Sequence, residues 1–201
     1  MIPVTSSSSE AKARSRRIGR TDRGATMVEF AIIAIALFSM IFGIIEGAFA
    51  VRARNTINNA VDDAARRGAV AGTNNNADYL VLQQLFGRGA RDAATVEYVV
   101  VYKADNGSAE VPADCKAGVP VDKVCNVFYP GTFDTDESGF GCPSGNGTSW
   151  CPNTRTSEDE LSFLGVYVKA KYEPILDQLL VDFSFDVNAN SLQVIETSGE
   201  R

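Results

Sequence analysis

Histidine is missing from all 201 residues of this chain. Histidine is the commonest general base near neutral pH and the commonest zinc ligand, so its absence argues against hydrolases and zinc enzymes. The sequence also contains no Ser/His/Asp set, no Cys/His pair and no glycine-rich loop able to hold a phosphate. These absences predict a protein that is not an enzyme and that carries no metal and no cofactor.

Basic residues are scarce outside the N-terminus. Residues 1–24 contain six basic and two acidic side chains, whereas residues 52–201 contain 13 basic and 21 acidic ones. Because the acidic excess leaves no basic stripe, nucleic acid is not expected as a partner. Residues 1–24 are too polar to build a core, and we interpret them as a basic leader peptide.

Residues 25–51 form an apolar run, ATMVEFAIIAIALFSMIFGIIEGAFAV, in which the only charges are Glu29 and Glu46. A helix of this length spans about 40 Å, and about 20 apolar residues are enough to cross a bilayer core. Lys and Arg beside a membrane helix stay on the cytoplasmic side. We therefore predict a single-pass transmembrane helix in the inner (cytoplasmic) membrane, with the N-terminus in the cytoplasm and residues 52–201 outside it.

The junction between leader and helix, RGATMVEFA, carries a specific pattern. Gly24 ends the leader, Ala25 begins the apolar run, Glu29 is the fifth residue after Gly24, and Phe30 follows it. This pattern resembles the class III, prepilin-type signal. More narrowly, it resembles the TadE family of minor pilins (pseudopilins) of tight-adherence, or Tad/Flp, pilus systems.

The resemblance implies a structural role in pilus assembly. It implies that a prepilin peptidase cuts after Gly24, which makes Gly24 a substrate position and not a catalyst. Glu29 is then expected to pair with the new ammonium group of Ala25, on its own or a neighbouring subunit. The implied partners are other pilins and the pilus assembly machinery, reached through the N-terminal helix.

Other interpretations of the N-terminus remain open. Glu29 also suits a helix N-terminus at the membrane interface, without any role in assembly. The segment Ala48-Phe49-Ala50 has the small-x-small form of a signal peptidase site, although the apolar run exceeds the 7–15 residues of such signals. An uncleaved anchor, or a secreted product, would instead display an extracellular binding domain.

The helical pattern continues through residues 52–72, an amphipathic extension. Small and apolar residues recur there at steps of three and four, and Gly72 provides a stop: Ala53, Ile57, Ala60, Val61, Ala64, Gly68 and Ala71. One helix of about 45 residues is therefore predicted. We expect its small-residue stripe to pack on the protein's own sheet, the alternative being a partner.

Residues 73–201 are expected to form an exported α+β domain in which that helix packs on a small antiparallel sheet. Asp78 can cap a short helix that ends at Gly87 or Gly89. Two-residue alternation predicts strands at 94–103, 163–172 and 181–189, the last continuing to 195 with a bend at Asn190. The first strand is expected to place Val96, Tyr98, Val100 and Tyr102 on one face. Residues 173–180 suit a helical turn.

All four cysteines lie in the loop region 106–157. An even number in an exported segment predicts disulfides, and we favour the local pairs Cys115–Cys125 and Cys142–Cys151 over the other two pairings. The sequence contains no C-x₂₋₄-C pair, so metal-binding thiolates are not expected. Asp134–Gly139 matches the start of a calcium loop, but position twelve is Gly145 where such loops need Glu. Calcium binding and a solvated acidic turn both remain open there.

Overall fold

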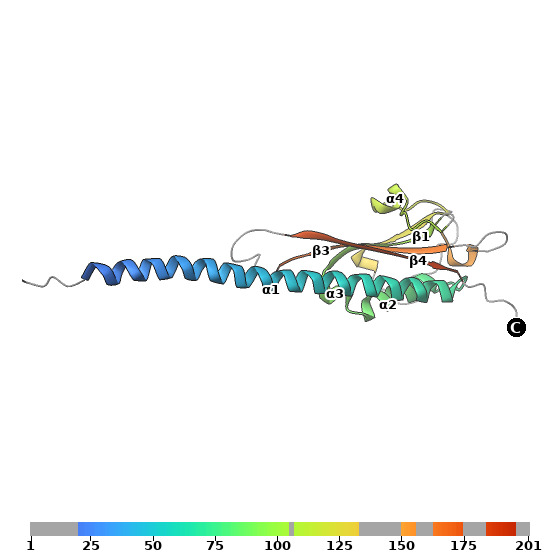
Figure 1. Cartoon of the computed structure of the whole chain (residues 1–201). Helices are drawn as coiled ribbons and strands as arrows, with labels where there is room; N and C mark the ends of the chain where they lie inside the picture. The colour runs from blue at the N-terminus through green and yellow to red at the C-terminus, as the bar shows by residue number, and fades with distance from the viewer. Residues whose placement is uncertain (1–19, 105–106, 133–149, 156–162, 175–183, 196–201) are drawn as a thin grey trace, which may run out of the picture. The chain divides into compact units, whose positions relative to one another are not determined.

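The computed structural model describes residues 20–104, 107–132, 150–155, 163–174 and 184–195 (Figure 1). The chain divides into two units, residues 1–44 and 45–201. Helix α1 (Arg20–Ala71) begins in the first unit and continues into the second, which contains every other element. It starts inside the predicted leader, because Arg20 and the residues after it contain no proline and suit a helix. It ends where predicted, before Gly72, whose φ of 55° is a left-handed stop.

The second unit contains a four-stranded antiparallel sheet in the order β2-β1-β3-β4. The predicted α+β class is therefore confirmed. The strands are β1 (Thr95–Ala104), β2 (Cys125–Phe128), β3 (Phe163–Tyr172) and β4 (Phe185–Val194). The helices after α1 are α2 (Ala77–Gly87), α3 (Ala90–Ala93), α4 (Ala113–Lys116) and the 3₁₀ turns η1 (Pro130–Thr132) and η3 (Pro152–Thr154).

The C-terminal part of α1 covers one face of this sheet, together with α2 (Figure 1). Every residue of the predicted small-residue stripe is buried, from Ala53 to Ala71. Its partners are apolar side chains of the strands, among them Val99, Val166 and Val187. The expectation that the stripe packs on the protein's own sheet is thus confirmed.

Strand β1 differs from the predicted pattern at its start. The pairing of β1 with β3 shifts between Val96 and Tyr98, so Glu97 is an extra residue in the strand. A bulge of this kind reverses the side-chain alternation beyond it. Val96 therefore lies in the core beside α1, whereas Tyr98, Val100 and Tyr102 face the opposite side. The prediction that all four share one face was wrong for Val96.

The opposite face of the sheet is covered by the segment that contains α4 and β2. Cys115 and Cys125 form a disulfide, as predicted, and both are fully buried against Tyr98, Val100 and Tyr102. Closing a loop of this length contributes about 2–3 kcal/mol in the chain-entropy model. Strand β2, which begins at Cys125, was not predicted.

Several sequence predictions concern the remaining strands and loops. β3 has the predicted bounds, and β4 runs to Val194 without interruption at Asn190, so the predicted bend is wrong. Cys151 also forms a disulfide. Its predicted partner Cys142, the candidate calcium loop 134–139 and the helical turn proposed at 173–180 involve residues outside those the structure describes.

Gly165 offers a test of how closely the side chains are packed on the face of the sheet that carries Tyr98, Val100 and Tyr102. It lies opposite Tyr102 in the sheet, and a methyl group at Gly165 would collide with the Tyr102 ring. We expect Gly165→Ala to lower the free energy of unfolding by about 1–3 kcal/mol, because the ring must move within a dense core.

Chemical unfolding of the full chain in detergent, followed by the fluorescence of its single tryptophan, Trp150, measures this change. Gly87→Ala is the matched control, since nothing lies within 4 Å of a methyl group there. Equal effects of the two substitutions would contradict the packing argument.

Candidate functional site

The apolar part of α1 is the feature least explained by the fold. Its large side chains are exposed along the whole run, from 76 % at Met27 to 39 % at Phe49. A helix of a soluble protein normally buries at least one face. The part of the chain that the structure describes has one helix long and apolar enough to cross a membrane, the Gly24–Ala71 part of α1.

The predicted processing and assembly residues all lie on the exposed start of this helix. Gly24, Ala25, Glu29 and Phe30 are exposed, and a methyl group added at Gly24 would meet nothing within 4 Å. Glycine inside a helix costs about 1 kcal/mol relative to alanine, so the packing of this chain gives no reason for Gly24. Ala25 and Glu29 are four residues apart and share one helix face. Within the described residues, Glu29 has no ion pair or hydrogen bond.

A family model described as TadE-like protein matches residues 24–66. This segment is TadE-like. The match confirms the resemblance over the apolar run and the first part of the packed stripe, and it supports a protein associated with the Tad pilus. TadE-like proteins form a family of structural pilus components and not of enzymes. No curated protein and no solved structure matches the chain.

The second acidic residue of the TadE-like segment, Glu46, contacts the folded domain. The Tyr172 hydroxyl donates a hydrogen bond of 2.8 Å to Oε1 of Glu46. Burial, and then the Glu46 carboxylate, raise the pKa of Tyr172 to about 12. Tyr172 also packs on Phe185, with ring centroids 5.1 Å apart. The apolar run has only two charges, Glu29 and Glu46. The Glu46 carboxylate therefore accepts a hydrogen bond from the last residue of β3.

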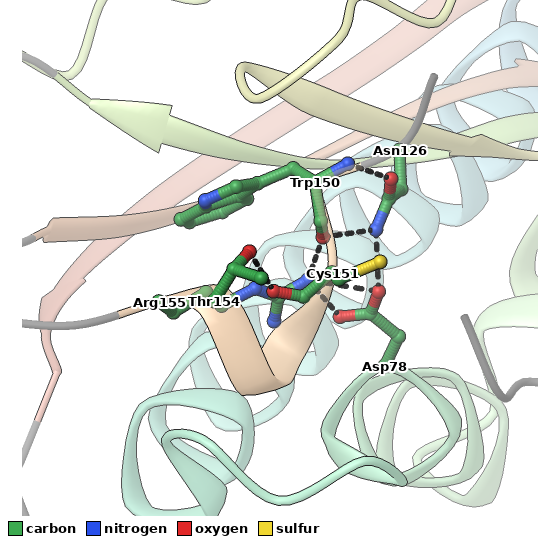
Figure 2. A network of polar contacts seen from close by, with 6 residues as sticks. All are labelled: Asp78, Asn126, Trp150, Cys151, Thr154 and Arg155. Atoms are coloured by element: carbon green, nitrogen blue, oxygen red, sulfur yellow. Dashed lines mark hydrogen bonds and ion pairs between the residues drawn. The ribbon is translucent and has the colours of Figure 1, made fainter. Parts of the chain in front are cut away.

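A buried polar network lies between α2, β2 and the turn η3 (Figure 2). Nη2 of Arg155 is 2.7 Å from Oδ1 of Asp78, and both side chains are almost completely buried, at 0 % and 3 % exposed. Asn126 donates to Asp78 Oδ2 at 2.7 Å and to the Trp150 carbonyl at 2.8 Å. The side-chain oxygen Oδ1 of Asn126 in turn accepts a hydrogen bond of 2.8 Å from the backbone N–H of Trp150.

The network corrects the prediction for Asp78. Asp78 forms no cap at the start of α2; it lies in the first turn and neutralises a buried guanidinium 77 residues later in the chain. That guanidinium also lies 4.2 Å above the Trp150 ring. Its Nε and Nη1 atoms form no hydrogen bond with the described residues. Because no face of the pair is open to solvent, we interpret it as a structural clamp for the turn η3.

Sequence reasoning missed this network, since Asn126 and Arg155 lie in the cysteine-rich region where no periodicity exists. The described residues contain no group of three or more His, Cys, Asp or Glu that could hold a metal. Among the described residues, the apolar part of α1 is therefore the surface best suited to recognition by another molecule.

The Asp78–Arg155 pair makes a prediction about stability. Removing one partner of a buried pair leaves an uncompensated charge and costs about 3–5 kcal/mol. We expect Asp78→Asn and Arg155→Met each to destabilise the full chain by that amount, and the double variant to lose much less than the sum. Urea unfolding followed by Trp150 fluorescence measures all three.

The control is the exposed pair between Asp63 and Arg88, whose oxygen and nitrogen are 2.8 Å apart. Asp63→Asn should cost less than about 1 kcal/mol. Strictly additive losses at Asp78 and Arg155 would show that the two charges do not stabilise each other.

The bond between Tyr172 and Glu46 makes a second prediction. Tyr172→Phe should destabilise the domain by about 1–3 kcal/mol at neutral pH, because a carboxylate loses its donor. Tyr167→Phe is the control, since it removes a hydroxyl from a buried tyrosine, 4 % exposed, that has no hydrogen bond among the described residues.

The same contact gives a pH dependence. The raised pKa favours neutral Tyr172 in the folded state, so the stabilisation is complete below pH 10 and is lost as the pH rises toward about 12. The difference in unfolding free energy between the wild type and Tyr172→Phe should therefore shrink over this range. A difference that stayed constant to pH 12 would exclude this contact as its source.

Proposed function

We propose that this chain is a minor pilin (pseudopilin) of a Tad/Flp pilus, cut after Gly24 by a prepilin peptidase and assembled through its apolar helix. The observation that carries the proposal is an apolar run, residues 25–51, whose large side chains are exposed and whose sequence is TadE-like. Before cleavage, the basic leader favours an N-terminus in the cytoplasm and a domain outside the inner membrane.

The surroundings of Gly24 support cleavage at that position. The glycine is exposed, and the space for a side chain beside it is empty. A protease must hold the backbone on both sides of the bond that it cuts, and a residue without a side chain permits the closest approach. The helical conformation observed at Gly24 would have to open locally for this, and glycine weakens the helix at this point.

Glu29 supports assembly after cleavage. Cutting after Gly24 creates an ammonium group on Ala25, one helical turn from the Glu29 carboxylate. A carboxylate near the centre of a membrane costs about 2.5–3.5 kcal/mol, and Glu29, one turn into the apolar run, bears a smaller cost that a positive partner would offset. The ammonium group of the same or a neighbouring subunit would supply that partner, and it would select correctly cut subunits.

The apolar run also contains residues suited to packing between helices. Gly43 and Gly47 form a G-x-x-x-G pair, and a methyl group at either would meet nothing within 4 Å. Such pairs let two membrane helices approach closely. Ser39, one turn earlier, donates its hydroxyl to the Ile35 carbonyl at 2.8 Å, so it needs no partner from outside its own helix. Pilin subunits would use this small-residue face to pack side by side.

Mass spectrometry of the mature N-terminus tests the proposal. In cells with an intact processing machinery, we expect the chain in membrane fractions to begin at Ala25. Gly24→Leu should leave the leader attached, because a branched side chain blocks the cut. Gly43→Leu is the matched control: it changes an equally open glycine of the same helix and should be processed normally.

Two other N-termini would support the alternative interpretations of the N-terminal segment. A chain that begins at Val51 would be a product of signal peptidase, and a chain that begins at Met1 would be an uncleaved anchor. Either result would contradict the pilin proposal and would favour a displayed extracellular binding domain.

A further inference from the structure

The face of the sheet opposite α1, on which α4 lies, carries a cavity of about 800 Å³ (Figure 1). One wall consists of residues 108–113 and Lys116 of α4, and another consists of residues of β3 and β4, all within the second unit of the chain. A cavity of this size is in the range of small-molecule binding sites. Polar residues from both walls line it: Ser108, Glu110, Lys116, Tyr167, Asn188 and Asn190.

Strands β3 and β4 bring three of these polar residues together. Tyr167 pairs with Asn190 in the register of the two strands, and Asn188 lies two residues earlier on the same face of β4. Ala189, between the two asparagines, is buried in the core beside α1, so the two amides lie on the side of the cavity. Nδ2 of Asn190 donates a hydrogen bond of 2.7 Å to the Ala109 carbonyl. This bond joins the two walls and fixes one amide in place.

The other two side chains of this group, Tyr167 and Asn188, have no hydrogen bond with the described residues. Tyr167 is only 4 % exposed, whereas Asn188 is exposed. Burial raises the pKa of Tyr167, so its hydroxyl stays protonated at neutral pH and can donate. A phenol and an amide can each donate and accept, so together they suit a ligand that does both.

Charged side chains of both signs lie at the edge of the cavity. Lys116 and Glu110 are exposed, and neither side chain forms an ion pair with the described residues. Lys103 also lines the cavity, but it shares a face of β1 with Val101, which packs in the core beside α1. Because the charges of Lys116 and Glu110 balance, the cavity gives no preference to a multiply charged anion such as phosphate. It suits a neutral ligand rich in hydrogen-bonding groups.

The remaining wall of the cavity and the pairing of the strands narrow the class of ligand. The backbone of β3 is already paired with β1 and β4, so a peptide cannot add to it as a further strand. A sugar ring presents neighbouring hydroxyl groups, each a donor and an acceptor, together with a face of C–H groups. The hydroxyls match the phenol, amide, carboxylate and ammonium groups, and the C–H face matches the apolar residues Ala109, Pro112 and Ala113.

We propose that this cavity binds one sugar unit of a neutral oligosaccharide, with Tyr167 and Asn188 as hydrogen-bonding residues and Glu110 and Lys116 at its edge. The inference goes beyond the pilin proposal, since it does not depend on cleavage after Gly24. Helix α1 covers the other face of the sheet, so contacts made through α1 leave the cavity available. A domain exported as proposed above would meet polysaccharides outside the cytoplasm.

Isothermal titration calorimetry of the full chain tests the proposal. The detergent must lack a sugar headgroup, which would compete, and the probes are maltotriose, cellotriose and triacetylchitotriose. We expect saturable binding of at least one probe. Tyr167→Phe and Asn188→Ala should each weaken that binding about fivefold, as expected for the loss of one hydrogen bond. Tyr167→Phe should leave urea unfolding unchanged, because its hydroxyl has no partner among the described residues.

Gln193→Ala is the matched control for Asn188→Ala. Gln193 is an amide residue of the same strand, and it does not line the cavity. Its substitution should leave the affinity for the trisaccharide unchanged. Equal losses from Asn188→Ala and Gln193→Ala would overturn the proposal, since they would show an effect on β4 as a whole and not on a site.

Two further results would also overturn the proposal. If none of the three trisaccharides shows saturable binding to a chain that still unfolds cooperatively in urea, a neutral sugar is not the ligand. If inorganic phosphate displaces a bound trisaccharide, the cavity recognises an anion through Lys116. Neither result depends on where the mature chain begins, so both would leave the pilin proposal standing.

Discussion

The structure depends on the close packing of α1 against the sheet. Ala60, Val61, Ala64 and Ala65 are fully buried, and most of these side chains are single methyl groups. Small side chains bring the helix axis near the strands, so that Ile57 and the valines of β1 and β3 fill the space between them. A larger residue in this row would have to push the helix away from the strands at that point.

The continuous helix α1 therefore has two parts with different surroundings. Up to Val51 its apolar side chains are exposed, and from Ala53 onward only one narrow stripe is apolar and buried. The change falls at Arg52, where the chain gains its first positive charge after the leader. Glu46 and its partner Tyr172 lie near this change. The end of the apolar run is therefore where the TadE-like segment contacts the last residue of β3.

Features of the fold that depend on local interactions could be predicted from the sequence, and those that depend on distant residues could not. The helix stripe, β3 and most of β4 depend on periodicities visible within about ten residues, and these were read correctly. The bulge at Glu97 depends on pairing with β3, about 70 positions later in the chain. The clamp depends on Asp78 meeting Arg155, a separation of 77 residues. No local pattern distinguishes Asp78 from an ordinary helix cap, and β2 is too short to show alternation.

The resemblance to TadE-like proteins could be predicted because its signal is a local sequence motif, whereas the roles of Gly24, Ala25, Glu29 and Phe30 stay predictions. The glycines fall into two groups, those that packing within the chain explains and those that it does not. Gly165 and Gly68 have other side chains where a methyl group would go, so packing within the chain explains them. Gly24, Gly43 and Gly47 have open space there, although glycine weakens a helix at each of them. Packing within the chain therefore does not explain these three glycines. Under the proposed function, a peptidase at the first and a neighbouring helix at the other two would supply a reason for them.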